Sequence, residues 1–472
     1  MKIKNSASIK QIKLPDPLQK IAWDIVNQQG KIFLVGGWVR DWLLGISSKD
    51  YDLEIYGIEL DELVKILSGY GTPNLVGKSF GVITMRISGI NYDFAFPRTE
   101  SKTGKGHRGF MVKPDSSLTF NEASSRRDFT INAMGIRIPE LILEDPHGGQ
   151  KDLEKRLLRH VSDAFSEDPL RAMRAIQFAA RFELEIDSDT QGLCSKQPLE
   201  ELPAERLFEE FKKLLLKANK PSIGLEWMRK MDMLRYFPEL KALVGTKQDP
   251  IWHPEGDVWA HNNLVINAAA HIRDTEIDID EEKAEFEKLA LMFGALCHDL
   301  GKPATTVLKD GKWRSPAHSA WGERPARSFL ARLTRDKKLV EQVIVYVREH
   351  LKPAQLYNAR DVVKDSTIRR LSLKVDIEKL VRMAKADHFG RETPDALEES
   401  FEAGDWLLEK SRALQVLDSK PEPLLTGKML LSLGMKPGPQ VGNIIRESFD
   451  LQLEGKLETK EAVLEWAKKK LV

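Results

Sequence analysis

Two aspartates separated by one residue are the side chains whose types and spacing best suit chemistry. Asp50 and Asp52 follow an apolar run, residues 32–35, and a pair of glycines, Gly36 and Gly37. Alternate residues of a strand point to the same face, so the two carboxylates would aim at one point. A hard divalent cation, Mg²⁺ above all, can be held there together with phosphate oxygens.

The glycine pair supplies backbone N–H groups that can approach phosphates closely, next to a helix start that favours anions. Arg40 adds a cation nearby. These parts, together with the aspartates, predict a site that grips a nucleoside triphosphate and transfers part of it.

Asp93 lies in a second strand-like run, residues 92–96. As a third carboxylate it could orient a metal ion or accept the proton of an attacking hydroxyl. The alternative is a residue on the solvent face of a strand edge, and the sequence leaves both open.

Basic residues recur in the run 126–133. We expect Arg127 to contact phosphate or sugar, whereas Arg126 suits a structural pair with a carboxylate equally well. Asp128 and Asn132 are expected to cap or tie the turn that follows, and not to carry chemistry.

Four segments now occur in the order typical of one family, namely residues 34–52, 126–133, 145–160 and 167–174. They resemble the motifs of class II tRNA nucleotidyltransferases, the CCA-adding enzymes, and of the related bacterial poly(A) polymerases, within the polymerase-β-like superfamily. The resemblance is strong over residues 30–240 and looser beyond. It implies CTP, ATP and tRNA as partners.

Asp168 and Arg171 resemble the nucleotide-selecting motif of that family. Three residues apart at a helix start, they would share a face. A carboxylate acceptor beside a guanidinium donor can pair with the exocyclic amine and unprotonated ring nitrogen of cytosine and adenine. Uracil and guanine present a carbonyl and a ring N–H instead, so the carboxylate would face another acceptor. A plain salt bridge at a helix start is the alternative. Arg174, one turn on, could reach the triphosphate, and Gln177 stands where some family members have another arginine.

The segment 98–110 is rich in glycine and basic residues and predicts a mobile loop that attracts phosphate. It resembles the loop that CCA-adding enzymes use in moving from C to A addition, which favours full CCA addition.

A second group of candidate ligands lies in the helical part of the chain. Residues 296–303 resemble the core of HD-type metal-dependent phosphohydrolases, and residues 252–256 resemble a motif of CCA-adding enzymes that carry an HD domain. Such a set could hold one or two divalent ions, with imidazole favouring a transition metal, although single histidines are often core residues. The hypothesis is phosphatase or 2′,3′-cyclic phosphodiesterase activity. The six candidate ligands are His261, His298, Asp299, His318, His350 and Asp387.

Composition adds limits. A chain of 472 residues is too long for a single hydrophobic core, so several domains are expected, and 42% hydrophobic residues suffice for ordinary globular packing. The net charge of +1 gives no indication of a nucleic-acid partner. Two distant cysteines, Cys194 and Cys297, are expected in the core, within a reducing compartment. No apolar run approaches membrane-spanning length and residues 1–13 lack a signal sequence, so a cytoplasmic protein without membrane association is expected.

Apolar spacing predicts a helix over 15–29, strands over 32–35, 51–55, 81–87 and 91–96, and helices from about residue 150 onward. The predicted fold class is α+β: a polymerase-β-like nucleotidyltransferase head followed by an all-α body that includes an HD domain. The expected parts are an N-terminal helix (1–29), the head (30–160), a nucleotide-selecting neck (161–240), the HD domain (241–395) and a helical tail (396–472).

The predicted function is template-independent addition of CCA to tRNA 3′ ends from CTP and ATP. The alternatives are a poly(A) polymerase or A-adding enzyme and, from another class, an HD phosphohydrolase whose head only binds nucleotide. The sequence leaves the oligomeric state, the metal of the HD site and the way addition stops undetermined.

Overall fold

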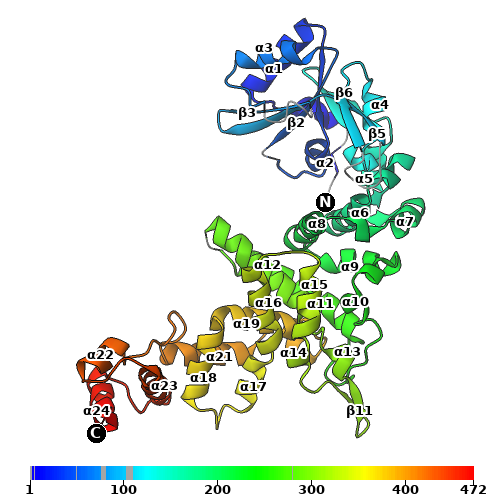
Figure 1. Ribbon diagram of the computed structural model, residues 1–472. Helices are drawn as coiled ribbons and strands as arrows, with labels where there is room; N and C mark the ends of the chain where they lie inside the picture. Colours follow the sequence, from blue (N-terminus) through cyan, green and yellow to red (C-terminus); the bar gives the residue numbers. More distant parts are fainter. Residues whose placement is uncertain are drawn as a thin grey trace. The chain divides into compact units, whose positions relative to one another are not determined.

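The computed structural model describes residues 3–471, with gaps at 5, 49, 76–80, 103–109 and 279. It forms two compact units (Figure 1): Met1–Leu214 with Ile223–Tyr236, and Leu215–Ser222 with Phe237–Val472. The finer division into five parts stays a prediction. Most of the loop expected to serve C-to-A addition lies outside the described residues.

A six-stranded mixed sheet, in the order β3-β4-β2-β1-β7-β8, forms the centre of the first unit. Strands β2 and β4 are parallel, and the other neighbours are antiparallel. The four strands predicted from apolar runs are all present. The sheet strands are β1 (Lys31–Val35), β2 (Tyr51–Tyr56), β3 (Val82–Ile87), β4 (Ile90–Ala95), β7 (Gly135–Ile138) and β8 (Ile142–Glu144).

Both faces of β1 are buried, which explains its unbroken apolar sequence. Phe33 packs with Tyr56 and Phe120 in one cluster. A Cβ at Gly135 would lie 2.5 Å from the Phe120 ring, so glycine lets β7 pass this cluster. Helix α1 (Asp16–Asn27) contacts β1 and α3 (Leu60–Ser68).

The rest of the first unit is increasingly helical, as apolar spacing predicts. Helix α6 (Leu170–Phe182) buries ten of its residues. The remaining elements are η1 (Ser6–Gln11), α2 (Gly37–Leu43), β5 (Arg98–Lys102), β6 (Phe110–Pro114), α4 (Phe120–Ser124), η3 (Thr130–Asn132), α5 (Gly149–Glu154), β9 (Leu157–Leu158), η4 (Asp163–Glu167), β10 (Glu185–Ile186), α7 (Ser188–Ser195), η5 (Leu199–Glu201), α8 (Ala204–Lys217), α9 (Pro221–Lys230) and η6 (Met233–Tyr236).

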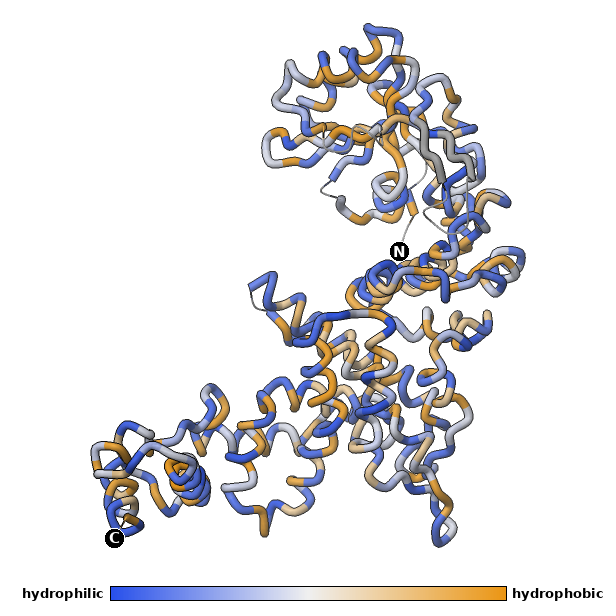
Figure 2. The backbone as a smooth tube through the Cα atoms, viewed as in Figure 1, coloured by the Kyte–Doolittle hydropathy of each residue, from blue (hydrophilic) through white to orange (hydrophobic). Residues whose placement is uncertain are grey.

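Among the residues of the second unit that the structure describes, the secondary structure is helical apart from one hairpin, β11 (Val307–Lys309) and β12 (Lys312–Arg314). Its core helices, α11 (Val258–Thr275), α12 (Glu281–Cys297), α16 (Lys337–Glu349) and α19 (Ile377–Phe389), pack together. The C-terminal half of α12 is buried on every side, which is typical of a helix in the middle of a core. Its apolar residues are coloured towards orange in Figure 2.

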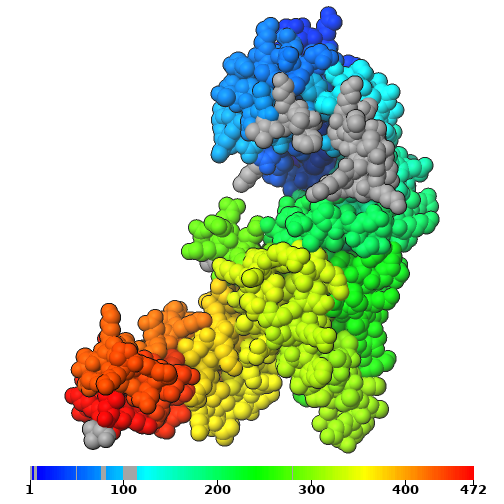
Figure 3. Space-filling view, viewed as in Figure 1, coloured from blue at the N-terminus to red at the C-terminus, as the bar shows by residue number. Residues whose placement is uncertain are grey.

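The other helices of this unit are shorter or lie nearer the C-terminus. Helices α22, α23 and α24 pack around a separate buried apolar cluster that includes Leu430 and Val463. Figure 3 shows the outer surface of this C-terminal segment in orange and red. The bounds are α10 (Pro238–Lys241), α13 (Lys302–Thr305), α14 (His318–Trp321), α15 (Glu323–Ala331), α17 (Lys352–Asn358), α18 (Asp365–Lys374), α20 (Pro394–Leu397), α21 (Glu402–Ala413), α22 (Gly427–Ser432), α23 (Pro439–Leu453) and α24 (Lys460–Leu471).

The two cysteines and the apolar content of the helices are both subjects of expectations from composition. Cys194 and Cys297 are both buried free thiols, so their expected place in the core is confirmed. Over the part of the chain that the structure describes, no helix is both long and apolar enough to cross a membrane.

Candidate functional site

Three carboxylates meet on two neighbouring strands of the head. Strands β2 and β4 pair in parallel, with Asp52 opposite Asp93. Asp50 lies one residue before β2, where its Oδ1 accepts a hydrogen bond from Asn91 Nδ2 at 3.1 Å. All three aspartates are exposed. The strand register therefore places Asp93 beside the predicted aspartate pair, which sequence spacing alone could not decide.

The negative charges of this carboxylate group act on one another. Desolvation, and then the charges of Asp93 and Asp50, raise the pKa of Asp52. The pKa of Asp93 is raised by desolvation and then by Asp50. Because oxygen donors crowd together with excess negative charge, the donor set fits a hard divalent cation.

The glycine pair forms the turn between β1 and α2. Gly36 has φ +64°, a left-handed conformation that glycine adopts without strain. A Cβ at this position would lie 3.3 Å from Nη1 of Arg127. Gly37 is the first residue of α2. The absence of a side chain at Gly36 therefore lets the backbone of this turn lie close to the guanidinium of Arg127.

Arg40 is turned inward. Its side chain donates through Nε and Nη2 to Oδ1 of Asp41, at 2.8 and 2.7 Å, and through Nη1 to Oδ1 of Asn132. Only 4% of the residue is exposed. As placed, Arg40 ties α2 to η3 and offers no surface to a triphosphate, so the expected phosphate contact stays a prediction.

Arg127 has an acidic partner that the sequence analysis did not name. Its Nη2 donates to Oε2 of Glu54 at 3.1 Å, and its Nη1 donates to the backbone carbonyl of Asn132 at 3.1 Å. Glu54 lies two residues beyond Asp52 on β2 and therefore shares its face. The alternation Asp50, Asp52, Glu54 was the available signal.

The basic run after α4 is held by internal pairs. Arg126 pairs with Glu167 at 3.0 Å, as its structural alternative predicted. Asp128 accepts from the Phe129 amide at 2.8 Å and from Asn132 Nδ2 at 3.0 Å, so its expected role in tying this turn is confirmed.

Arg174 is bound to the same turn. Its Nε donates to Oδ2 of Asp128 at 2.7 Å. Burial opposes ionisation of Asp128, but Arg174 and Asn132 hold the pKa of Asp128 below its usual value. The expected contact of Arg174 with a triphosphate stays a prediction, since the guanidinium is already paired.

Asp168 and Arg171 are joined by a backbone hydrogen bond of 3.0 Å, from the Arg171 amide to the Asp168 carbonyl, but their side chains have other partners. Oδ2 of Asp168 accepts from Nη2 of Arg206 at 2.8 Å. Arg171 donates to the carbonyls of Ala164 and Arg126, both at 2.8 Å. Arg206 could not be identified from local spacing because it lies 38 residues after Asp168, on α8.

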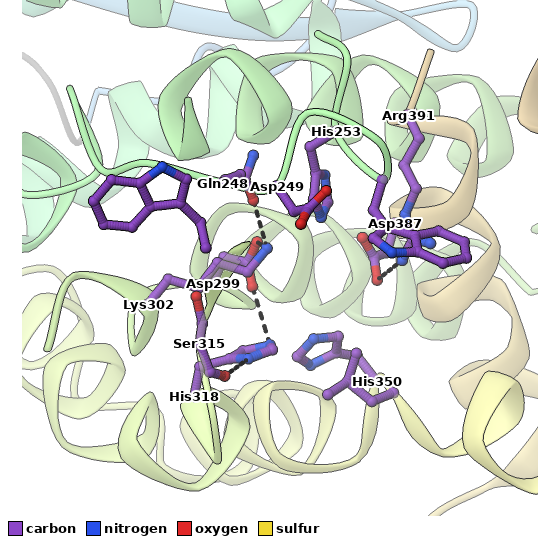
Figure 4. A pocket seen from close by; sticks show the side chains of 13 residues that line it. Gln248, Asp249, His253, Asp299, Lys302, Ser315, His318, His350, Asp387 and Arg391 are labelled. Atoms are coloured by element: carbon purple, nitrogen blue, oxygen red, sulfur yellow. Dashed lines mark hydrogen bonds and ion pairs between the residues drawn. The ribbon is translucent and has the colours of Figure 1, made fainter. Parts of the chain in front are cut away.

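The six predicted ligands of the helical unit converge, and Figure 4 shows four of them, Asp299, His318, His350 and Asp387. They come from α11, the ends of α12 and α16, the start of α14, and α19, and each is at most 9% exposed. Two sets of three have their ligand atoms within 4.8 Å of one another. The sets are His261, His298 and Asp387, and Asp299, His318 and His350.

Backbone carbonyls fix the orientation of three of these imidazoles. Nδ1 of His298, His318 and His350 lies 2.8, 2.8 and 2.9 Å from the carbonyls of Ala295, Ser315 and Val347, respectively. A carbonyl can only accept, so Nδ1 carries the proton and Nε2 presents its lone pair to the centre of the cluster.

Several inward atoms have no hydrogen-bond partner. Among the described residues, these are Nε2 of His298, Nε2 of His318 and Oδ1 of Asp299, all buried, whereas Oδ2 of Asp299 forms an ion pair with Nζ of Lys302 at 2.7 Å. Asp299 Oδ2 lies 3.2 Å from His298 Nε2, and its Oδ1 lies 3.3 Å from His318 Nε2. Buried acceptors that face one another at these distances fit a divalent cation held between them.

Burial also keeps two imidazoles in the neutral form that binds metals. Burial, the largest cause, lowers the pKa of His350 to about 3. It lowers the pKa of His253, which also borders the cluster, to about 4. Both rings are therefore neutral at neutral pH.

Glu255 is a positioning residue that the sequence analysis missed. Its Oε1 accepts from Nδ1 of His253 and from Nδ1 of His261, both at 2.8 Å. Only 1% of its side chain is exposed. Glu255 therefore turns Nε2 of His261 toward Asp387, 3.0 Å away. Its place in the segment 252–256, which resembles an HD-associated motif, was the available signal.

Known proteins match both the head and most of the chain. A family model described as "Poly A polymerase head domain" matches residues 32–159, and one described as "Probable RNA and SrmB- binding site of polymerase A" matches residues 184–243. The Multifunctional CCA protein of Xylella fastidiosa (strain 9a5c) is 34% identical over 373 residues, which cover 76% of this chain and 84% of that protein. The chain belongs to the CCA-adding enzyme family.

Further members of this family agree. The Multifunctional CCA protein of Xanthomonas campestris pv. campestris (strain B100) is 35% identical over 377 residues, covering 76% of this chain and 85% of that protein. A Bacillus stearothermophilus CCA-adding enzyme in complex with CTP has a TM-score of 0.65 and 21% identity, covering 97% of this chain and 98% of that one. A Thermotoga maritima CCA-adding enzyme complexed with tRNA has a TM-score of 0.60 and 19% identity, covering 100% of both chains. These structures share the fold of this chain. Together with the match to the poly(A) polymerase head domain, the nucleotidyltransferase fold implies a need for a divalent metal ion.

Proposed function

We propose that this protein adds CCA to the 3′ end of tRNA from CTP and ATP without a template. The observation that carries this is the meeting of Asp50, Asp52 and Asp93 on adjacent strands of a head that matches the poly(A) polymerase family. Membership of the CCA-adding family supports addition limited to three nucleotides over long A tails.

Asp50 and Asp52 would hold Mg²⁺, which supplies charge neutralisation at the triphosphate and a more acidic 3′-hydroxyl. The hydroxyl oxygen of the tRNA end forms a bond to the α-phosphorus, and the bond to pyrophosphate breaks. Asp93 would accept the hydroxyl proton, and the raised pKa of its carboxyl suits that role. Arg127, 3.3 Å from the Cβ position of Gly36, would contact the phosphates.

Base selection is assigned to Asp168 and Arg171. Arg206 and two backbone carbonyls hold these side chains in the present arrangement. On binding of cytosine or adenine, the exocyclic amine of the base would donate to Asp168 and its unprotonated ring nitrogen would accept from Arg171, in place of the present contacts. The sites of Arg40 and Arg174 would support the triphosphate only after their internal pairs open.

Incubation of tRNA lacking its 3′ CCA with each labelled NTP tests this proposal. Incorporation of CMP and then AMP, ending after three nucleotides, is expected. Long tails of AMP alone would identify a poly(A) polymerase. Phosphate release without incorporation would support the hydrolase alternative.

The buried histidine cluster favours a second activity, a metal-dependent phosphatase or 2′,3′-cyclic phosphodiesterase. The six ligands would hold one or two divalent transition-metal ions, which supply a hydroxide nucleophile at neutral pH. In a phosphomonoester, the oxygen of water forms a new bond to phosphorus while the ester P–O bond breaks and the alcohol leaves with a proton. The unpartnered inward atoms of His298, Asp299 and His318 support this proposal.

Replacement of His298 and Asp299 by alanine tests the second activity. The variant should lose bound metal, measured by mass spectrometry, and phosphate release from a nucleoside 2′-phosphate, while it keeps CMP and AMP addition. If addition and hydrolysis fall together, the idea of two separate sites is wrong.

A further inference from the structure

The histidine cluster opens into a cavity of about 270 Å³. This volume is close to the lower end of the roughly 300–1,000 Å³ typical of small-molecule sites. Figure 4 shows Asp299, His318 and His350 on one side of it and His253, Asp387 and Arg391 across from them. The ligand cluster occupies only part of the lining, and the remaining residues can define what else the cavity accepts.

Two tryptophans, Trp252 and Trp313, are part of that lining. Trp252 is 64% exposed, an unusual position for so large an apolar side chain. Trp313 is partly exposed and lies on β12 of a hairpin whose other residues in β11 and β12 are exposed. The two reach one cavity from segments about 60 residues apart in the chain, so their meeting is a property of the fold.

Each tryptophan is held close to the ligand cluster. Trp252 immediately precedes His253, and an amide-to-carbonyl hydrogen bond of 3.2 Å to Asp249 fixes its backbone. Trp313 is two residues before Ser315, whose carbonyl accepts from Nδ1 of His318 at 2.8 Å. Because both segments are tied to the cluster, the two tryptophans stay part of the lining of the cavity into which the cluster opens.

Cationic groups supply the complementary charge in the same cavity. Lys302 Nζ lies 2.7 Å from Asp299 Oδ2, and Arg391 Nη2 lies 3.5 Å from Asp387 Oδ2. Nε of Arg391 is buried without a hydrogen-bond partner among the described residues. A phosphate can bind beside such cations, while a planar base can stack on tryptophan whatever its identity.

We propose that Trp252 and Trp313 are the base-binding walls of this cavity, so that it takes a nucleoside phosphate, free or at the end of an RNA strand, over a base-free phosphoester. The inference rests on the proposed hydrolytic site. It adds two specificity-determining residues that belong neither to the six metal ligands nor to the site in the head.

Steady-state phosphate release from the full-length, metal-loaded protein tests the proposal with two substrates. Trp252→Ala and Trp313→Ala should raise KM for a nucleoside 2′-monophosphate about tenfold, the scale of one base–aromatic stack. Their kcat/KM for β-glycerophosphate should stay within about twofold of the unaltered protein, because that ester has no base to stack. Trp252→Phe should restore most of the loss.

Trp321 provides the matched control, since it is a tryptophan of the same unit with 62% exposure and is not part of the cavity lining. Trp321→Ala should change neither substrate. Equal losses for the nucleotide and for β-glycerophosphate in Trp252→Ala, or no loss for either, would overturn the proposal. An oligoribonucleotide ending in a 2′,3′-cyclic phosphate, run in parallel, separates an RNA end from a free nucleotide.

A binding measurement keeps this inference separable from the hydrolytic activity. Quenching of tryptophan fluorescence by the nucleoside 2′-monophosphate should be smaller in Trp252→Phe than in the unaltered protein. Quenching that depends on Trp252 without any hydrolysis would reject the hydrolase and retain the base-binding walls. Quenching that is identical in both proteins would reject the walls.

Discussion

The carboxylate group of the head and the histidine cluster of the helical unit are prepared for their ligands in opposite ways. Asp50, Asp52 and Asp93 are exposed, and the arginines expected to assist them are engaged in internal pairs. The histidine cluster is buried, and its imidazoles are held by backbone carbonyls and by Glu255.

This difference follows from the ligands. A triphosphate brings its own charge and leaves again as pyrophosphate, so an open site whose internal ion pairs can be exchanged suits repeated turnover. A resident metal ion needs ligands fixed in advance, because each unpaired buried acceptor is costly without the cation. We therefore expect substitutions in the head to act on turnover and substitutions around the cluster to act on metal retention.

The largest expected effect is at the open site. Asp52→Asn should lower CMP incorporation on the order of a thousandfold or more, because Asp50 alone, of the two carboxylates proposed to hold the metal, cannot balance its charge beside the triphosphate. Labelled CTP and tRNA lacking CCA measure it. Asp61→Ala, at an exposed acid of α3, is the matched control and should change nothing. Normal incorporation by Asp52→Asn would contradict the catalytic role of this residue.

At the buried site, Glu255→Gln should weaken metal binding about 10- to 100-fold. The amide still fits the space but no longer accepts both imidazole N–H groups as a charged carboxylate does. Metal retained during titration with a chelator measures the effect. CTP incorporation serves as the internal control and should be unaltered, and unchanged metal retention would remove the positioning role.

A substitution of Asp128 measures how much its ion pair with Arg174 contributes to the free energy of unfolding. Asp128→Asn should lower the free energy of unfolding by about 2 kcal/mol, because Arg174 loses its buried partner. The pKa of Asp128 is held below its usual value, so its ionised form stabilises the fold above about pH 4 and that stability is lost as pH falls through the lower folded-state pKa. Urea unfolding at pH 7 and pH 3 should show a smaller pH dependence for the variant, and an equal pH dependence in both proteins would contradict the assignment.

The smallest effect is expected where one internal pair is exchanged for substrate. Arg206→Ala frees Asp168 and should shift the ratio of kcat/KM for CTP and ATP only a few-fold, about 1 kcal/mol or less for a partly exposed pair. Separate incorporation assays with each nucleotide provide the ratio. Arg229→Ala, which breaks an ion pair with Glu226 elsewhere in the same unit, should leave it unchanged.

The sequence alone determined the residue types and their local order. The apolar run before Gly36 predicted β1, the two-residue spacing predicted the Asp50 and Asp52 pair, and apolar residues at helical spacing predicted α6. These features depend on period and on neighbours a few residues apart, which sequence records directly.

Only the tertiary structure decided which distant groups meet. The parallel register of β2 and β4 brought Asp93 to Asp52, and the packing of α8 gave Asp168 its partner Arg206. Packing of five helical segments gathered the six buried ligands. Such pairings depend on strand register and helix packing across 38 to more than 100 residues, and no local period encodes them.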